Sequence, residues 1–153
     1  MKIREDEFII IKIQQLPDDI QVLAELAHNE GFRFIQRLVE DFLSGENRFD
    51  ADGEALFEVR FIDRLVAIGG LNIDPYSPSG CTGRVRRCYV HPDHRSHGIG
   101  QLLLRTIEEH AAKTFQQLHL FTDTDNASLF YQRMGYEVIK GNENASHAKW
   151  LRV

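Results

Sequence analysis

The sequence predicts a single α/β domain in which a mixed central sheet is flanked by helices. β-Branched and aromatic runs alternate with segments whose apolar residues recur at helical spacing. The expected order is β-α-α-β-β-β-α-β-α-β-β, so an antiparallel front passes into parallel pairing around the long third helix. A length of 153 residues without an internal repeat or interdomain linker fits one domain over residues 1–153.

The first half of the chain predicts a strand, two amphipathic helices and a hairpin. Polar residues or glycines stand where each helix should begin or end, and two apolar runs around a polar turn are typical of an antiparallel hairpin. In order, we expect a strand at 8–13, a helix capped by Asp18 or Asp19 and ended at Gly31, a helix ended at Ser44 and Gly45, a loop at 46–53, strands at 56–62 and 65–73 around Asp63 and Arg64, and a loop at 74–80.

The second half alternates strands with helices. A helical stripe of apolar residues follows a glycine-containing loop, and a second, shorter helix ends at a glycine. In order, we expect a strand at 84–90, a loop at 91–97, a helix from Ile99 to Ala111, a strand at 118–121, a helix capped by Asp125 or Asn126 and ended at Gly135, and strands at 136–139 and 147–151.

Composition excludes several classes of protein. Hydrophobic residues at 42% and charged residues at 27% exclude a disordered chain, and a net charge of −5 argues against general nucleic-acid binding. The apolar runs are far shorter than the ~20 residues that span a bilayer, and residues 1–6 are too acidic for a signal peptide. Cys81 and Cys88 would lie ~23 Å apart in an extended stretch, beyond disulfide reach. We therefore expect a cytoplasmic protein with reduced thiols and no membrane partner.

The most informative stretch is a glycine loop between a strand and a helix, with the spacing Arg-x-x-Gly-x-Gly from Arg95 to Gly100. Unpaired amides and the positive dipole end of a helix let an anion approach the backbone, which suits a pyrophosphate. Residues 80–105 carry five arginines against the single acid Asp93. The Gly-x-Gly spacing alone is explained about as well by two glycines that only allow a tight turn as by an anion-binding site.

Two nucleotide-binding motifs do not fit this loop. A dinucleotide-binding turn needs a third glycine where Leu103 stands, and a P-loop needs Lys-Ser/Thr after the last glycine, where Gln101 and Leu102 stand. Both readings are rejected.

Two blocks of the second half carry a family pattern. They are Tyr89-Val90-His91-Pro92-Asp93-His94-Arg95-Ser96-His97-Gly98-Ile99-Gly100-Gln101-Leu102-Leu103 and Asn126-Ala127-Ser128-Leu129-Phe130-Tyr131-Gln132-Arg133-Met134-Gly135-Tyr136. A strand ending in Val, then His-Pro-x-x-Arg-x-x-Gly-x-Gly and a Leu-rich helix, followed later by Asn, an aromatic pair and Gly-aromatic, resembles the GNAT family of N-acetyltransferases. The resemblance covers residues 84–140; over residues 1–75 only the order of elements agrees.

The resemblance implies acetyl-CoA as co-substrate and gives its contacts. The pantetheine arm would pair with the strand end at Tyr89 and Val90, and the amide of Asn126 would contact the cofactor in addition to capping a helix. The pyrophosphate would lie on the backbone of Arg95, Ser96, His97, Gly98, Ile99, Gly100 and Gln101.

The resemblance also implies two catalytic groups. Tyr131 would protonate the leaving thiolate, although a core role for this aromatic ring also fits the sequence, and the Val90 N–H would stabilise the tetrahedral oxyanion. Family members that carry a glutamate on the central strand differ from this chain, in which residues 84–90 contain none. Glu58, His91 and a water chain stay open as the base, and Glu58 fits a solvated strand residue better.

No metal is expected, because Pro92 breaks any helix that would bring His91, His94 and His97 onto one face. Cys88 is interpreted as a buried small hydrophobe rather than a nucleophile.

The expected acceptor is a primary amine of a small molecule or peptide. It would enter beside residues 74–80 and the acidic segment 40–54, which favours a cationic amine, although a solvated acidic face explains that segment equally well. A non-catalytic acyl-CoA-binding, sensing or protein-interaction domain is the alternative function. Trp150 fits a core or an interface aromatic, and a homodimer is left open.

Overall fold

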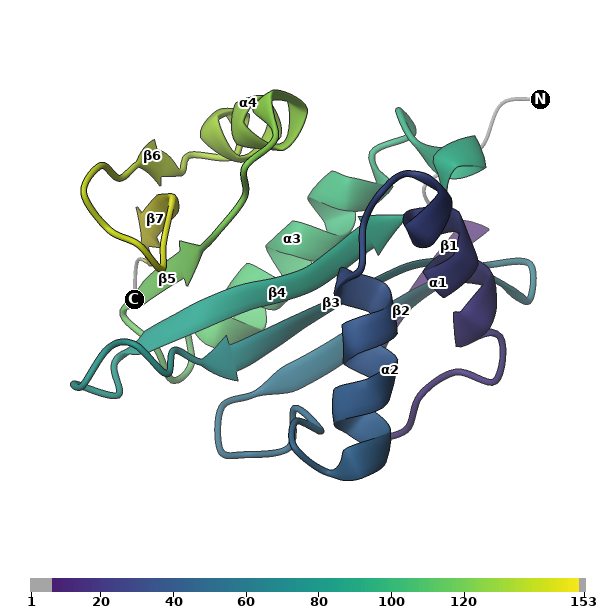
Figure 1. Ribbon diagram of the computed structural model, residues 1–153, viewed down its shortest axis with the longest axis horizontal. Coiled ribbons are helices and arrows are strands. Elements are labelled where there is room, and N and C mark those ends of the chain that lie inside the picture. The colour runs from purple at the N-terminus through teal and green to yellow at the C-terminus, as the bar shows by residue number, and fades with distance from the viewer. Residues whose placement is uncertain (1–6, 152–153) are drawn as a thin grey trace.

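The structure, a computed structural model, describes residues 7–151 as one seven-stranded mixed sheet with helices on both faces (Figure 1). The order of elements is the one that the sequence predicts. The strands are β1 Phe8–Ile13, β2 Ala55–Phe61, β3 Arg64–Ile73, β4 Thr82–Val90, β5 Gln117–Leu120, β6 Glu137–Val138 and β7 His147–Trp150, and the helices are α1 Ile20–Asn29, α2 Phe34–Ser44, α3 Ile99–Ala111 and α4 Asp125–Arg133.

The strands lie in the order β1-β2-β3-β4-β5-β7-β6. Every neighbouring pair is antiparallel except β4 and β5, which are parallel because α3 returns the chain between them. The expected passage from antiparallel to parallel pairing around this helix is confirmed. No helix among the described residues is long and apolar enough to cross a membrane.

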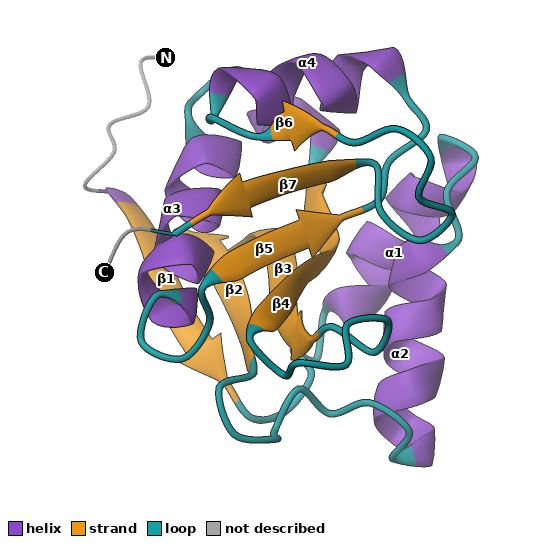
Figure 2. Ribbon diagram, turned by 90° about the vertical axis from the view of Figure 1, so that its left-hand side faces the viewer, coloured by secondary structure: helices purple, strands orange, loops and turns teal. Residues whose placement is uncertain are grey.

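Two apolar cores form on opposite faces of the sheet. Figure 2 shows α1 and α2 on one side and α3 on the other. Helix α3 buries Leu103 and Ile107 against Val85 and Leu118, while α1 and α2 bury Leu23 and other apolar residues on the second face. Because side chains alternate along a strand, consecutive residues of β4 point to opposite faces of the sheet, except at a bulge.

The structure corrects two local expectations in the first half. The hairpin turn is formed by Ile62 and Asp63, with φ of 45° and 63°, so the turn begins one residue earlier than expected and Arg64 already belongs to β3. Asp19 stands at the start of α1 but does not cap it, since its carboxylate accepts hydrogen bonds from Arg60 at 2.9 and 3.2 Å. Residues 1–6, on which the expectation about a signal peptide rests, lie outside the described residues.

Candidate active site

Strand β4 loses one of its neighbours half-way along its length. It pairs with β5 only from Thr82 to Arg84, whereas its pairing with β3 continues to Val90. Strand β5 ends at Leu120, where the chain leaves toward α4 (Figure 1). The edge of β4 on the β5 side is therefore open over residues 85–90, and backbone groups that point there are free to pair with a ligand.

The pairing register indicates which backbone groups face this opening. His91 N–H donates to the Val66 carbonyl at 2.7 Å, and hydrogen-bonded pairs alternate with non-bonded pairs in an antiparallel ladder. Val90, opposite Ala67, therefore directs its N–H and C=O away from β3. Its carbonyl accepts a hydrogen bond from Arg95 Nε at 3.1 Å, in agreement with this direction. The backbone of Tyr89 faces β3 by the same alternation, so of the two strand-end residues expected to pair with pantetheine, only Val90 is placed to do so.

A bulge in β4 turns the strand just before this end. Gly70 lies opposite Arg86 and Ile68 opposite Tyr89, so one more residue is accommodated on β4 than on β3. Arg87 takes the extra position with φ of 61°. As a result, Arg86 and Arg87 both lie on the α2 side of the sheet, and Cys88 lies on the α3 side.

The loop before α3 presents free amides. Ser96 and Gly98 both have positive φ, 67° and 80°, a conformation that groups successive N–H vectors on one side. Leu102 N–H donates to the Gly98 carbonyl at 3.0 Å, so the amides of Ile99, Gly100 and Gln101 precede the helical ladder and lack a partner within the helix.

Space and side-chain exposure around this loop suit an anion. A Cβ added at Gly98 would meet nothing within 4 Å, and one at Gly100 would touch Phe130 at 3.4 Å and Val90 at 4.0 Å. The side chains of Ser96, His97 and Gln101 are exposed, whereas that of Ile99 is 2% exposed and belongs to the core, so this residue offers only its amide. The free amides and the open space of this loop therefore suit the binding of a pyrophosphate.

Arg95 holds the loop to the rest of the fold. Its guanidinium donates to both carboxylate oxygens of Glu30 at 2.7 Å and lies over the ring of Tyr89 at 5.3 Å. The Tyr89 hydroxyl also donates to Glu30. The hydrogen bond from Arg95 keeps the pKa of Glu30 below its usual value. The Arg95 charge is thus compensated by Glu30.

Tyr131 lies on α4 with its hydroxyl against the Cys88 thiol. Its ring is surrounded by those of Phe130, Tyr136 and His147, at centroid distances of 5.2, 5.5 and 6.2 Å. Burial, reinforced by Cys88, raises the pKa of the phenol well above its usual value. Tyr131 is therefore protonated at any physiological pH and can donate a proton.

Cys88 is an unreactive neighbour in this arrangement. Burial raises the pKa of its thiol to about 12, so the nucleophilic thiolate is scarce at neutral pH. Cys81 and Cys88 are both free thiols.

Asn126 does not cap α4. Thr124 does so, with its hydroxyl accepting from the Ala127 N–H at 3.4 Å. Asn126 is exposed in the first turn, and its amide makes no hydrogen bond to any described residue. A contact with the cofactor stays a prediction for this side chain.

The two side-chain candidates for the base are both engaged. Glu58 is 9% exposed, and its carboxylate accepts from Arg60 Nε at 2.9 Å, so the expectation of a solvated residue is wrong. His91 Nδ1 accepts from the Asp93 N–H at 3.1 Å, and burial lowers the pKa of its ring. Within residues 7–151 no group of three or more His, Cys, Asp or Glu side chains is arranged to hold a metal ion.

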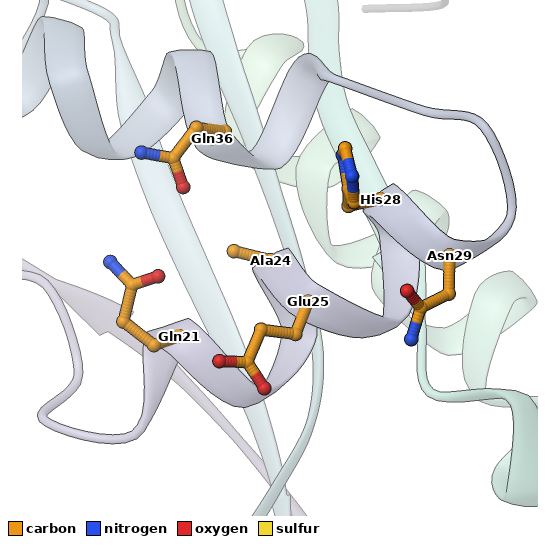
Figure 3. A pocket seen from close by; sticks show the side chains of 6 residues that line it. All are labelled: Gln21, Ala24, Glu25, His28, Asn29 and Gln36. Atoms are coloured by element: carbon orange, nitrogen blue, oxygen red, sulfur yellow. The ribbon is translucent and has the colours of Figure 1, made fainter.

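A cavity of about 380 Å³ lies elsewhere, in the groove between α1 and α2 (Figure 3). Polar side chains such as Gln21, Glu25 and Gln36 line it, and none of the predicted site residues does. The cavity therefore belongs to the outer helical layer rather than to the opening beside β4.

Comparisons with known proteins agree with this geometry. A family model described as an acetyltransferase (GNAT) domain matches residues 53–138. A provisionally assigned acetyltransferase from Exiguobacterium sp. 255-15 is 30% identical, with a TM-score of 0.84 over 94% of this chain and 93% of that one. No curated protein sequence matches significantly.

Two more distant structures share the fold. A GNAT-family acetyltransferase from Staphylococcus aureus is 18% identical, with a TM-score of 0.72 over 94% and 100% of the two chains. A provisionally assigned acyl-CoA N-acyltransferase from Klebsiella pneumoniae is 19% identical, with a TM-score of 0.66 over 95% and 98%. The chain belongs to the GNAT family of acetyltransferases, whose fold implies an acyl-CoA co-substrate.

Proposed function

We propose that this protein transfers an acetyl group from acetyl-CoA to a primary amine by direct attack, without a covalent enzyme intermediate. One arrangement carries the proposal: the open edge of β4 at Val90 is continuous with the free amides before α3, and the Tyr131 hydroxyl lies beside the same strand. An anion, an extended arm and a reacting carbonyl can thus be held in one line.

Each part of acetyl-CoA has a matching element. The pyrophosphate is bound by the amides of Gly98, Ile99, Gly100 and Gln101. The pantetheine arm lies along the open edge of β4 as an added strand, next to Val90, whose carbonyl already accepts from Arg95 and whose N–H stays free for the thioester oxygen. The thioester then lies where β4 and β5 separate, close to the side chain of Tyr131.

The chemistry forms a C–N bond and breaks a C–S bond. The neutral amine attacks the thioester carbonyl, and the Val90 N–H stabilises the negative charge that develops on oxygen. Collapse releases the thiolate of CoA, which takes a proton from Tyr131. Because Glu58 and His91 are engaged elsewhere, the proton of the incoming amine leaves through water.

A non-catalytic acyl-CoA sensor is the alternative. It would keep the amide cradle but would not need a proton donor beside the thioester. The Tyr131 hydroxyl, which lies beside Cys88 of β4, therefore favours the enzyme.

The deciding experiment measures thiol release from acetyl-CoA with a panel of amines, amino acids, polyamines and lysine peptides. We expect release that requires both acetyl-CoA and an amine and that yields the N-acetyl product. Binding of CoA without release for any acceptor would favour the sensor. Absence of both binding and release would contradict the placement of acetyl-CoA.

A further inference from the structure

The face of β4 turned toward α1 and α2 is rich in arginine. Residues directly opposite each other in a sheet share a face. Asn72 lies opposite Arg84 and Gly70 opposite Arg86, and both β3 residues contact the loop that follows α2. Arg87 reaches Asp41 of α2. Three arginines of one strand therefore point to the side of the sheet opposite α3.

Helix α2 adds a further arginine to the same place. The ring of Phe34, in its first turn, lies 6.1 Å from the Tyr89 ring, and Asp41, in its last turns, lies 3.6 Å from Arg87. Arg37 is one turn before Asp41 on the same helix face. It therefore lies alongside β4 between these two contacts, and its side chain is exposed.

Carboxylates compensate only part of this positive charge. Asp74 pairs with Arg84 at 3.0 Å and Asp41 with Arg87 at 3.6 Å. Arg86 and Arg37 have no carboxylate within ion-pair distance among residues 7–151.

The charges are close enough to affect one another. Burial, together with Arg86 and Arg37, lowers the pKa of Arg87, while Asp41 acts in the opposite direction. Within residues 7–151, two positive charges on this face thus lack a carboxylate partner, in a chain whose net charge is −5.

A cavity of about 70 Å³ lies beside Arg84 and His119, the last pair between β4 and β5. Asp74 and Asn144 also line it, whereas Arg86 and Arg37 do not, so it is separate from the two arginines without a carboxylate partner.

We infer that the amine acceptor carries a carboxylate, which Arg86 and Arg37 bind. The inference rests on the proposed function and names its substrate class. An acceptor reaching the thioester from the α2 side has its amine near Val90 and its carboxylate on the two arginines. A guanidinium binds a carboxylate through two parallel hydrogen bonds, which fixes the acceptor in one orientation.

Two carboxylates of the acidic segment are engaged and do not offset this charge. Asp41 is neutralised by Arg87, and the Glu54 carboxylate accepts hydrogen bonds from Asn72 and the Ile73 N–H. The arginines therefore reverse the preference for a cationic amine that the acidic segment suggests by itself.

The test compares matched acceptors on the full-length protein. Thiol release is measured with several amino acids, their carboxamides, the corresponding decarboxylated amines and O-phosphorylated amines. Calorimetry with CoA-bound protein measures acceptor binding without turnover. The variants are Arg86→Gln and Arg37→Gln, with Arg133→Gln as an exposed arginine on α4 and Asp50→Asn/Asp52→Asn as a test of the acidic segment.

We expect kcat/KM at least tenfold higher for amino acids than for their carboxamides or decarboxylated amines. Arg86→Gln and Arg37→Gln should each raise KM for the amino acid roughly tenfold to hundredfold, since each removes a charge-assisted hydrogen bond. The KM for acetyl-CoA and the kinetics with carboxamides should stay unchanged. Arg133→Gln and the double aspartate variant should behave like the parent, and melting temperatures check that all variants fold.

Other outcomes would overturn the inference. Equal or better activity with decarboxylated amines, preference for phosphorylated amines, or a higher acceptor KM in the double aspartate variant each contradict a carboxylate site. If amino acids bind to CoA-bound protein through Arg86 but no thiol is released, the anion site stands and acetyl transfer fails. If CoA does not bind, the proposed function fails, and binding of amino acids to the free protein still decides the anion site.

Discussion

The phenol of Tyr131 and the thiol of Cys88 lie together beside the opening at β4. Tyr131 and Cys88 touch each other, and burial keeps both protonated. We predict that Tyr131→Phe lowers kcat about 10²–10⁴-fold, with little change in CoA affinity, because the hydroxyl is needed only when the thiolate leaves. Steady-state kinetics and calorimetry with CoA measure the two quantities.

The neighbouring Tyr136 provides a matched control. Its hydroxyl donates to Glu108 of α3 at 2.8 Å. Tyr136→Phe should cost stability, about 1 kcal/mol for one hydrogen bond, but not kcat. An unchanged kcat in Tyr131→Phe, with chemistry shown to limit the rate, would remove Tyr131 from the mechanism.

Asp74 is the residue on which we expect local stability to depend most. Its side chain is 1% exposed and pairs with Arg84, which is 6% exposed. We predict that Asp74→Asn lowers the free energy of unfolding by about 3 kcal/mol, because Arg84 stays buried without its partner. Denaturant unfolding measures this loss, and Asp74→Asn/Arg84→Met should recover part of it.

The same carboxylate gives a prediction for acid pH. Burial alone would raise the pKa of Asp74, but hydrogen bonds from Ser77 and Arg84 outweigh it and hold the pKa below its ordinary value of 3.8. A lowered pKa means that the stabilisation is complete above that value and is lost as pH falls through the folded-state pKa. The melting temperature of the parent should therefore decrease more steeply below pH 4 than that of Asp74→Asn; parallel curves would contradict this.

At the scale of elements, the N-terminus of α3 is where the proposed pyrophosphate would lie. We predict that Gly100→Glu abolishes stabilisation by CoA while the fold persists, because the new carboxylate would repel the pyrophosphate from the amides. Gly100→Ala is the control, since its Cβ would lie at an ordinary contact distance of 3.4 Å from Phe130. Thermal unfolding with and without CoA separates the two variants. If Gly100→Glu binds CoA like the parent, the pyrophosphate does not lie on this loop.

At the scale of the whole molecule, ligand binding should appear as stability. We predict that CoA and acetyl-CoA raise the melting temperature, by an increment equivalent to about 2.7 kcal/mol at a concentration of one hundred times Kd. Differential scanning calorimetry over a range of CoA concentrations measures it. A melting temperature independent of CoA would contradict the placement of the cofactor.

The whole fold also shows what local sequence patterns can and cannot predict. Periodicity and glycines predicted the order of elements and the end of α2 at Ser44, because these signals act within a few residues. The hairpin turn was placed one residue late because a β-branched Ile62 at positive φ gives no turn signal. No local sequence pattern predicts the bulge at Arg87 either, since it arises from pairing with β3.

The residues of the candidate site also divide into those that local patterns predict and those that depend on the fold. The loop at residues 95–101 and Tyr131 could be predicted, because the family pattern fixes them within short blocks. Glu30 could not, since it joins Arg95 across 65 positions and lies outside those blocks. The pairing of Arg84 with Asp74, and the lack of a carboxylate partner for Arg86 in the part of the chain that the structure describes, also depend on which loops the fold brings to β4. Charge counted along the sequence therefore gives no sign of the two arginines on which the proposed carboxylate site depends.

The link from Glu30 to Arg95 and Tyr89 has a thermodynamic consequence. The Glu30 carboxylate, at the end of α1, accepts hydrogen bonds from Arg95, the first residue of the loop at 95–101, and from Tyr89 of β4. The elements on the two sides of the sheet are therefore linked through one residue. Any change in the affinity of one substrate caused by the other must be reciprocal. We predict that CoA tightens acceptor binding and that Glu30→Gln brings the ratio of acceptor Kd values, without and with CoA, close to one. Calorimetric titrations in both orders measure this ratio, and a ratio equal to that of the parent would mean that the two sites communicate by another route. If the prediction holds, a residue that touches neither substrate determines how strongly each depends on the other.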